Sequence, residues 1–306
     1  MKFQFFAAAL ATVILSGCQS TSTMNTPSTA PHVVNNVVVT EPVAVDYKSE
    51  LAIAKLTQII SHAKLENEKL AQLYYDRGVI YDSLGLRSLA QLDFRSALEL
   101  KPDYADAYNF IGIHLTLLGQ YSRAFDAFDS ALEIQPDHTY VHLNRGIALH
   151  YYGRNALSLE DIELFQLRNT SDPYRAIWMF IVESEINPVD ALTRLRFNAQ
   201  FVDKNLWGYQ IVRLLTGEIK EQEFINGMLS NVHSTKELAD RLCEGYFYLA
   251  KLKLMTEEFE QAKNYLRLSL ATNVYEFVEH KYARVELNKL YEQDRKALGA
   301  ISAEES

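Results

Sequence analysis

One pattern of residues occurs twice between positions 70 and 138, and the two copies are 34 residues apart. A fixed period of this length is typical of repeat proteins, in which each unit buries its apolar face only by stacking on its neighbours. The period therefore predicts an elongated array of stacked units. Five positions keep the same residue with this spacing: Gly78, Ala90, Phe94, Ala97 and Pro102 are followed by Gly112, Ala124, Phe128, Ala131 and Pro136.

The spacing is that of the tetratricopeptide repeat (TPR), a helix–turn–helix unit whose stacks present a concave surface to partners. We place the first repeat at residues 71–104 and the second at 105–138. A third, degenerate repeat at 139–173 begins in register and then drifts. Residues 174–242 are expected to form TPR-like helices, and a TPR-like repeat returns at 243–276.

Glycines at two kinds of position support this register. Gly78 and Gly112 are expected within a helix, where glycine costs about 1 kcal/mol relative to alanine. A cost repeated at the same place indicates a close approach of the paired helix, which we expect to occur through Ala90 and Ala124. Gly85 and its counterpart one repeat later, Gly119, suit the left-handed turn that ends the first helix of a unit.

Helices are also expected at both ends of the array. Residues 49–70 form an N-terminal helix region with Ser49 as a plausible N-cap, and this helix either caps the array or mediates dimerisation. Residues 277–306 form a C-terminal helix and tail. The predicted fold class is thus all-α, a TPR-type helical-repeat solenoid with capping helices that follows a disordered N-terminal tether.

The first residues have the layout of a secretory signal peptide, at 1–17. Lys2 precedes a short apolar run, and the segment ends in Leu-Ser-Gly before Cys18. This pattern resembles a bacterial lipobox, which predicts lipidation of Cys18; the alternative is an exported protein with a chance cysteine. Gln19 follows in place of an aspartate, which favours the periplasmic face of the outer membrane as the location.

Residues 18–48 are rich in Ser, Thr, Pro, Asn and Val, and they show no helical period. Prolines and asparagines flank the valines at 33–34 and 37–39, which can otherwise form a short strand. We therefore expect this segment to be a flexible tether that holds the folded domain away from the lipid.

Composition and motifs exclude several classes of function. The formal net charge is −9 and no basic cluster occurs, which argues against nucleic acid as a partner. The chain contains no HExxH, CxxC, GxSxG, P-loop or GxGxxG motif, so we expect no enzyme activity, no cofactor and no metal site. His138 and His142 have helical metal spacing but no third ligand, and we interpret them as packing residues. Cys243 is interpreted as a buried apolar residue.

Positions on the first helix of each repeat predict the lining of a concave partner-binding groove. The mixture of aromatic, aliphatic and amide side chains suits an extended peptide or a helix of another protein. Alternatively, these residues only pack against the next turn of the superhelix. A clamp for terminal carboxylates is excluded in the first repeat, where Tyr75 and Val79 replace two clamp residues. The predicted lining is Gln72, Tyr75, Val79, Asp82, Asp106, Asn109, Ile113, Thr116, Tyr140, Leu143, Ile147 and His150.

Three segments, Leu73 to Leu98, His142 to Arg154 and Phe277 to Ala283, closely resemble the NlpI family of TPR lipoproteins of the Gram-negative outer membrane. The likeness runs from about residue 49 to 291 and is looser across 155–240. It implies an all-α homodimer that acts as a non-enzymatic adaptor. The implied partners are a periplasmic C-terminal processing protease, a peptidoglycan endopeptidase that the protease degrades, and other cell-wall enzymes.

The residues alone leave two other functions open. One is a TPR lipoprotein that assists outer-membrane protein insertion or pilus secretin assembly. The other is an enzyme that acts on peptidoglycan, which the missing catalytic motifs disfavour. The only residue that the family's motifs assign directly is the lipidated Cys18.

Overall fold

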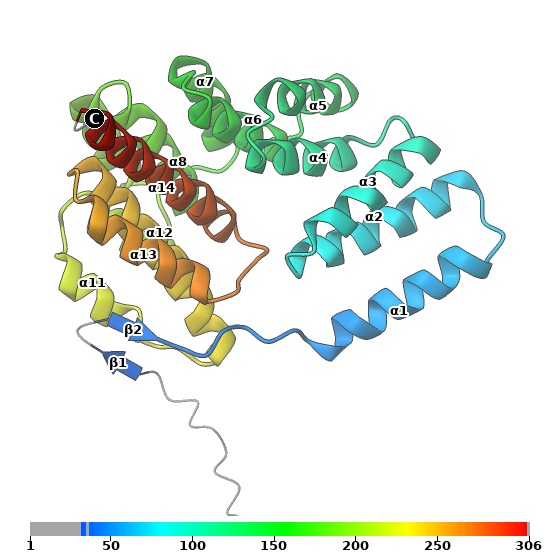
Figure 1. Cartoon of the computed structure of the whole chain (residues 1–306), viewed down its shortest axis with the longest axis horizontal. Coiled ribbons are helices and arrows are strands. Elements are labelled where there is room, and N and C mark those ends of the chain that lie inside the picture. Colours follow the sequence, from blue (N-terminus) through cyan, green and yellow to red (C-terminus); the bar gives the residue numbers. More distant parts are fainter. Residues whose placement is uncertain (1–31, 35–36, 305–306) are drawn as a thin grey trace, which may run out of the picture.

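The computed structural model describes residues 32–34 and 37–304, and its helices form a curved array of hairpins (Figure 1). This confirms the predicted all-α, TPR-type helical-repeat fold class. The elements in chain order are β1 (His32–Val34), β2 (Val37–Val39), α1 (Tyr47–His62), α2 (Asn67–Ser83), α3 (Arg87–Leu100), α4 (Ala105–Leu117), α5 (Tyr121–Ile134), α6 (Thr139–Tyr151), α7 (Asn155–Leu167), α8 (Pro173–Ser184), α9 (Pro188–Asn198), α10 (Gly208–Leu215), α11 (Glu221–Gly227), α12 (Thr235–Met255), α13 (Phe259–Ala271) and α14 (Val278–Glu304).

Each of the three predicted repeats corresponds to one helical hairpin: α2 with α3, α4 with α5, and α6 with α7. Gly85, Gly119 and Gly153 lie between the paired helices with φ values of +74°, +70° and +85°. L-residues with a Cβ rarely adopt this left-handed conformation, so glycine allows the chain to reverse there. Two further hairpins, α8 with α9 and α12 with α13, continue the array.

The close contact at the mid-helix glycines involves aromatic rings and not the alanines that we expected. A Cβ on Gly78 would lie 2.7 Å from Cε1 of Phe94, and one on Gly112 would lie 2.5 Å from Cε1 of Phe128. Because both rings are fully buried, each ring fills the space that the missing side chain leaves. The degenerate third repeat keeps this contact with a smaller residue, Ile162.

The prediction that residues 18–48 form a flexible tether is wrong for residues 37–43. These residues, which we call the N-terminal arm, dock on α12 and α13 (Figure 1). The hydroxyl of Tyr246 accepts a hydrogen bond from the backbone N–H of Val38 at 2.8 Å and donates one to its carbonyl oxygen at 2.6 Å. The backbone N–H of Val43 donates to the carbonyl oxygen of Thr272 at 2.8 Å.

The arm is extended because its valines favour β structure and can bury their side chains against the helical core. Val38 is almost fully buried in that core, and β1 pairs with β2 in antiparallel register. The predicted signal peptide at 1–17 and the predicted lipidation site Cys18 lie outside the described residues.

Helix α1 begins at Tyr47, two residues before the expected start, and its N-cap is Asp46 instead of Ser49. The Asp46 carboxylate accepts a hydrogen bond from the backbone N–H of Lys48 at 3.0 Å. None of the residues of α1 is buried, and the helix packs mainly against α2. Its apolar residues Ile53, Leu56 and Ile60 are only partly covered, so capping of the array and dimerisation through α1 both stay predictions.

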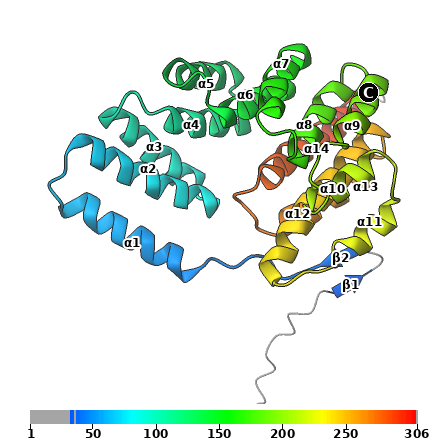
Figure 2. The ribbon, with the colours of Figure 1, turned by 180° about the vertical axis from the view of Figure 1, so that it is seen from behind.

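The end of α2 in the first repeat meets the start of the last helix, α14, so the array closes on itself (Figure 2). The ammonium of Lys281 in α14 forms a buried ion pair with Asp82 of α2 at 2.9 Å. A Cβ on Gly85, in the turn after α2, would lie 2.9 Å from the ring of Tyr275. Within the described residues, none of the helices is both long and apolar enough to cross a membrane.

Candidate binding surface

The structure places five of the twelve predicted groove residues in the interior, which corrects that part of the prediction. Two of them, Leu143 and Ile147, belong to the main apolar core. The other three are polar and bond to neighbouring parts of the chain. Buried side chains of this kind offer no surface to a partner. The five are Asp82, Asn109, Thr116, Leu143 and Ile147.

The buried polar residues join one repeat to the next. His114 Nε2 lies 2.8 Å from Asp82 Oδ1, and the Asn144 amide donates to Asn109 Oδ1 at 3.0 Å. Each bond links the first helix of one repeat to the first helix of the following repeat. A buried polar group that lacks a partner is costly, so these pairs help to fix the stacking of the repeats.

The remaining seven predicted residues keep some exposure on the inner side of the array. Gln72 is already engaged, because it accepts from the Tyr104 hydroxyl at 2.9 Å and donates to Asp76 at 2.8 Å. The most exposed aromatic side chain among them is Tyr140. Their role in partner binding remains a prediction. The seven are Gln72, Tyr75, Val79, Asp106, Ile113, Tyr140 and His150.

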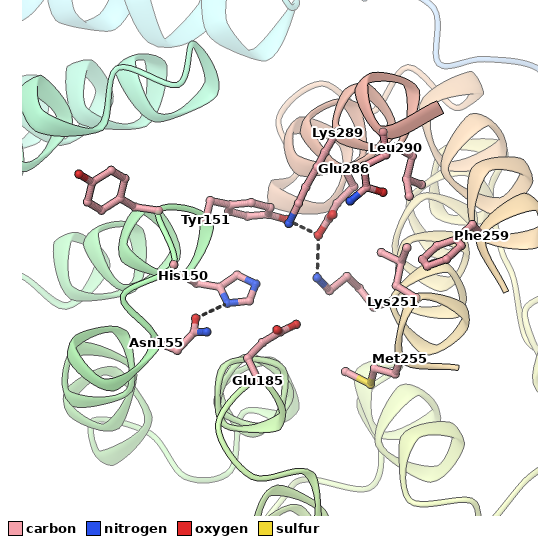
Figure 3. Close-up of a pocket in the computed structure, with 14 residues that line it drawn as sticks. His150, Tyr151, Asn155, Glu185, Lys251, Met255, Phe259, Glu286, Lys289 and Leu290 are labelled. Atoms are coloured by element: carbon pink, nitrogen blue, oxygen red, sulfur yellow. Dashed lines mark hydrogen bonds and ion pairs between the residues drawn. The ribbon is translucent and has the colours of Figure 1, made fainter. Parts of the chain in front are cut away.

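A cavity of about 350 Å³ lies between the α6–α7 turn, α8, α12 and α14 (Figure 3). Of the predicted groove residues it includes only His150. Its walls combine charged side chains with apolar ones, a mixture that suits a peptide better than a purely apolar ligand. The cavity is lined by His150, Tyr151, Tyr152, Gly153, Asn155, Glu185, Lys251, Leu254, Met255, Phe259, Glu286, Lys289, Leu290 and Gln293.

A buried ion pair forms the inner wall of this cavity. Lys251 Nζ lies 2.6 Å from Glu286 Oε1, and the Tyr151 hydroxyl donates to the same oxygen at 3.0 Å (Figure 3). Burial opposes ionisation of Glu286, but the ammonium of Lys251 outweighs it and holds the pKa of Glu286 below its ordinary value. The pair joins α12 to α14 and fixes the shape of the wall.

His150 is a neutral hydrogen-bonding group in this cavity. Burial lowers the pKa of its imidazole to about 4, and the nearby charge of Lys251 acts in the same direction. Nδ1 lies 3.0 Å from the side-chain oxygen of Asn155, so Nδ1 carries the hydrogen and Nε2 is an acceptor. His150 is therefore suited to receive a hydrogen bond from a ligand, but it cannot hold an anion by charge at neutral pH.

The sequence analysis missed Lys251 and Glu286, because a charged residue in an amphipathic helix is normally taken as part of its solvated face. One signal was available: Lys251 follows the apolar run of residues 246–250 directly. Asp161, which lies in the acidic segment at 160–163, is likewise buried. It binds both His142 at 3.0 Å and Arg145 at 2.7 Å.

The two histidines with metal spacing are packing residues, as expected. His138 bonds to Asp106 at 3.0 Å, while His142 bonds to Asp161. Within the described part of the chain, no cluster of three or more His, Cys, Asp or Glu side chains could hold a metal ion. Cys243 is buried, and burial raises the pKa of its thiol.

Two glutamates, the half-buried Glu244 of α12 and the buried Glu279 of α14, make stability depend on pH. Burial raises the pKa of both carboxyls, and the charge of Glu279 raises that of Glu244 further. Tyr174 and Tyr248 donate to them at 2.8 Å and 2.6 Å. Groups whose folded pKa is raised stabilise the fold below the unfolded pKa, and this contribution is lost as the pH rises through the folded value.

We therefore expect the melting temperature to fall as the pH rises from 5 to 9. The fall should be less steep in the Glu244→Gln variant. The amide keeps the size of the side chain but cannot ionise. Calorimetric melts across this pH range measure the two slopes, with Glu185→Gln, an exposed glutamate, as the control. Equal slopes for Glu244→Gln and the unaltered protein would contradict the assignment.

Comparison with known proteins agrees with the repeat register. Residues 71–104 match the family model of the tetratricopeptide repeat. Among solved structures, a TPR protein from Parabacteroides merdae is 16% identical, covers 80% of this chain and 99% of its own, and has a TM-score of 0.49. Pseudomonas aeruginosa PilF is 17% identical, covering 72% of this chain and 99% of its own, with a TM-score of 0.44. The type IV pilus biogenesis factor PilW is 19% identical, covering 78% of this chain and 98% of its own, with a TM-score of 0.43.

These likenesses are too distant to carry an argument about function. The classification rests on the match of the first repeat and on the stacked helical hairpins. The chain is a TPR-type scaffold for protein–protein interaction. Proteins of this class are generally non-catalytic.

Proposed function

We propose that the protein is a non-enzymatic adaptor anchored to the periplasmic face of the outer membrane. It presents a peptidoglycan endopeptidase to a C-terminal processing protease and gathers other cell-wall hydrolases and synthases. The observation that carries the proposal is the repeat array together with the NlpI-like segments at 73–98, 142–154 and 277–283. Catalysis comes from the partner protease and not from this chain.

The closed array supplies a physical mechanism for this role. Ion pairs and hydrogen bonds fix each repeat to the next, so two partners bound to one molecule are held at a defined separation. Binding the second partner then becomes an intramolecular event at high effective concentration. A lipid on Cys18 would confine this encounter to the membrane surface.

A degradation assay tests the adaptor role. The protein beginning at Gln19, which lacks the acylated cysteine, is mixed with purified protease and endopeptidase, and loss of the endopeptidase is followed by gel electrophoresis. We expect faster degradation with the protein than without it. Tyr140→Ala should reduce the acceleration, while Tyr291→Ala on the outer side of α14 should not. Unchanged degradation in the presence of the protein would refute the role.

Helix α1 supplies a surface for the proposed homodimer. Two of its apolar side chains, Tyr47 and Leu51, are strongly exposed in one chain. We expect the double variant Tyr47→Glu/Leu51→Glu to shift the mass measured by light scattering from dimer to monomer, because burying two carboxylates at an interface is costly. Lys64→Glu, at an exposed position just after this helix and not on its 47/51 face, is the control. A dimer that persists in the double variant would rule out this face.

The chain's two cysteines allow a clean test of the proposed lipid anchor. We expect Cys18→Ala to move the protein from the membrane fraction to the soluble fraction of cells, because the alanine carries no acyl chain. Cys243→Ala should remain in the membrane fraction, since that thiol is buried in the fold. Membrane association of Cys18→Ala would show that the lipobox interpretation is wrong.

A further inference from the structure

The second helix of the first repeat, α3, exposes a row of leucines that the repeat fold does not require. The row begins with Leu86, the residue just before α3, and continues in the helix with Leu89 and Leu92. Their exposed fractions are 45%, 43% and 58%. At the matching positions of the second repeat the residues are polar, namely Gln120, Arg123 and Asp126. Since the second repeat folds in the same way, the leucines are not explained by packing within the chain.

Two of these leucines form the wall of a groove at the outer rim of the array. The groove has a volume of about 460 Å³ and lies between the first turn of α3 and the end of α4. Leu118, exposed by 62%, supplies a third apolar side chain to it. The full lining is Gly85, Leu86, Arg87, Ser88, Leu89, Gln91, His114 and Leu118.

His114 forms the buried part of this lining and ties it to the first repeat. Its side chain is only 3% exposed, and its Nε2 lies 2.8 Å from Asp82 Oδ1. An ionised carboxylate only accepts hydrogen bonds, so Nε2 is the donor. This bond fixes the wall of the groove between α2 and α4.

The charge around the groove is positive, although the whole chain carries −9. Arg87 is the only arginine or lysine in the lining, and the lining has no carboxylate. Arg87 makes no ion pair within the described residues. Burial lowers the pKa of His280 in α14 to about 4, and the positive charges of Arg284 and Arg87 act in the same direction. The groove therefore favours a negatively charged partner.

We infer that this groove binds an acidic amphipathic helix of a protein partner. Its apolar stripe would cover Leu86, Leu89 and Leu118, and its carboxylates would face Arg87. A helix laid in an apolar groove is an established mode of peptide recognition. This surface differs from the inner face predicted from the sequence and gives the scaffold a second docking position.

A peptide titration tests the inference. The probe is a fluorescein-labelled synthetic helix that carries leucine on one face and glutamate on its flanks, and binding is read as fluorescence anisotropy. We expect Leu89→Arg, which copies Arg123 of the second repeat, to weaken binding by about tenfold or more, as loss of a central apolar contact does. Leu157→Arg is the matched control: Leu157 occupies the same position of the third repeat and is 45% exposed. Its affinity should be unchanged.

The charge requirement is tested separately. A probe with glutamine in place of glutamate should bind more weakly to the unaltered protein. In the Arg87→Gln variant the two probes should bind equally well. In Arg123→Gln, the control in the second repeat, the difference between the probes should remain. Melting temperatures confirm that each variant is folded. The inference is wrong if the acidic probe does not bind, or if Leu157→Arg weakens binding as much as Leu89→Arg. It is also wrong if Leu89→Arg turns a dimer into a monomer in light scattering, because the groove is then an interface between copies.

Discussion

Replacing Gly112 by leucine should lower the free energy of unfolding by about 3 kcal/mol or more, at the upper end of what overpacking a core costs. A Cβ at this position would already lie 2.5 Å from Cε1 of Phe128, and 2.7 Å from Cδ1 and Cζ of the same ring. The ring is fully buried between the paired helices of the second repeat and has no free space to move into. The two helices must therefore separate, which also disturbs the stacking on both neighbouring repeats.

Urea unfolding followed by circular dichroism measures this loss. Gly227→Ala is the matched control, because nothing lies within 4 Å of a Cβ at Gly227 and its backbone does not require glycine. That variant should unfold at the same urea concentration as the unaltered protein or at a slightly higher one. An unaltered midpoint for Gly112→Leu would mean that the two helices are not packed as described.

Removing the ammonium of Lys251 should cost about 3–5 kcal/mol at neutral pH, the usual effect of leaving one partner of a buried ion pair alone. In Lys251→Met the aliphatic part of the side chain is retained, but Glu286 is left buried with the Tyr151 hydroxyl as its remaining partner. Lys236→Met is the control. Lys236 forms its ion pair with Asp240 at the surface, where such a pair contributes about 1 kcal/mol or less.

The effect of Lys251→Met should also depend on pH. In the unaltered protein the folded pKa of Glu286 lies below its unfolded value, so this carboxylate stabilises the fold above the unfolded pKa and the contribution is lost as the pH falls. Without Lys251, burial outweighs the weaker effect of Lys289 on the pKa of Glu286, and the variant should be least stable at alkaline pH and recover towards acid pH. The double variant Lys251→Met/Glu286→Leu should regain most of the lost stability. No recovery in the double variant would show that the pair is not the cause.

The repeat register could be predicted from the sequence because its determinants are local. A glycine at a left-handed turn, such as Gly85, or a proline just beyond a helix end, such as Pro102, acts within a few residues of its own position. The period of 34 residues then aligns three helical hairpins, even where Ile162 replaces the phenylalanine of the first two repeats.

The features that sequence analysis missed depend on contacts between distant residues. Val38 was assigned to a tether because the residues near it in the sequence give no sign of its hydrogen bonds to the hydroxyl of Tyr246. Asp82 was assigned to the groove because the sequence does not show that it forms an ion pair with Lys281 of α14. The cavity around Lys251 and Glu286 was missed for the same reason. A charged residue on a helix is usually solvated, and only the packing of α12 against α14 shows that these two are buried.

The docking of the N-terminal arm constrains the order in which the chain can fold. The bond between Val38 and Tyr246 joins residues 208 positions apart, whereas most contacts of a repeat array are between neighbours. A chain that emerges from its amino end can form α2–α3 and the following hairpins one after another, but the arm has no site to bind until α12 and α13 have folded. The N-terminal arm is thus synthesised before the helices but reaches its place only after α12 and α13 have formed. Until then the apolar surface that Val38 covers stays open, and this interval is the period in which the protein is most exposed to chaperones, proteases and other unfinished copies.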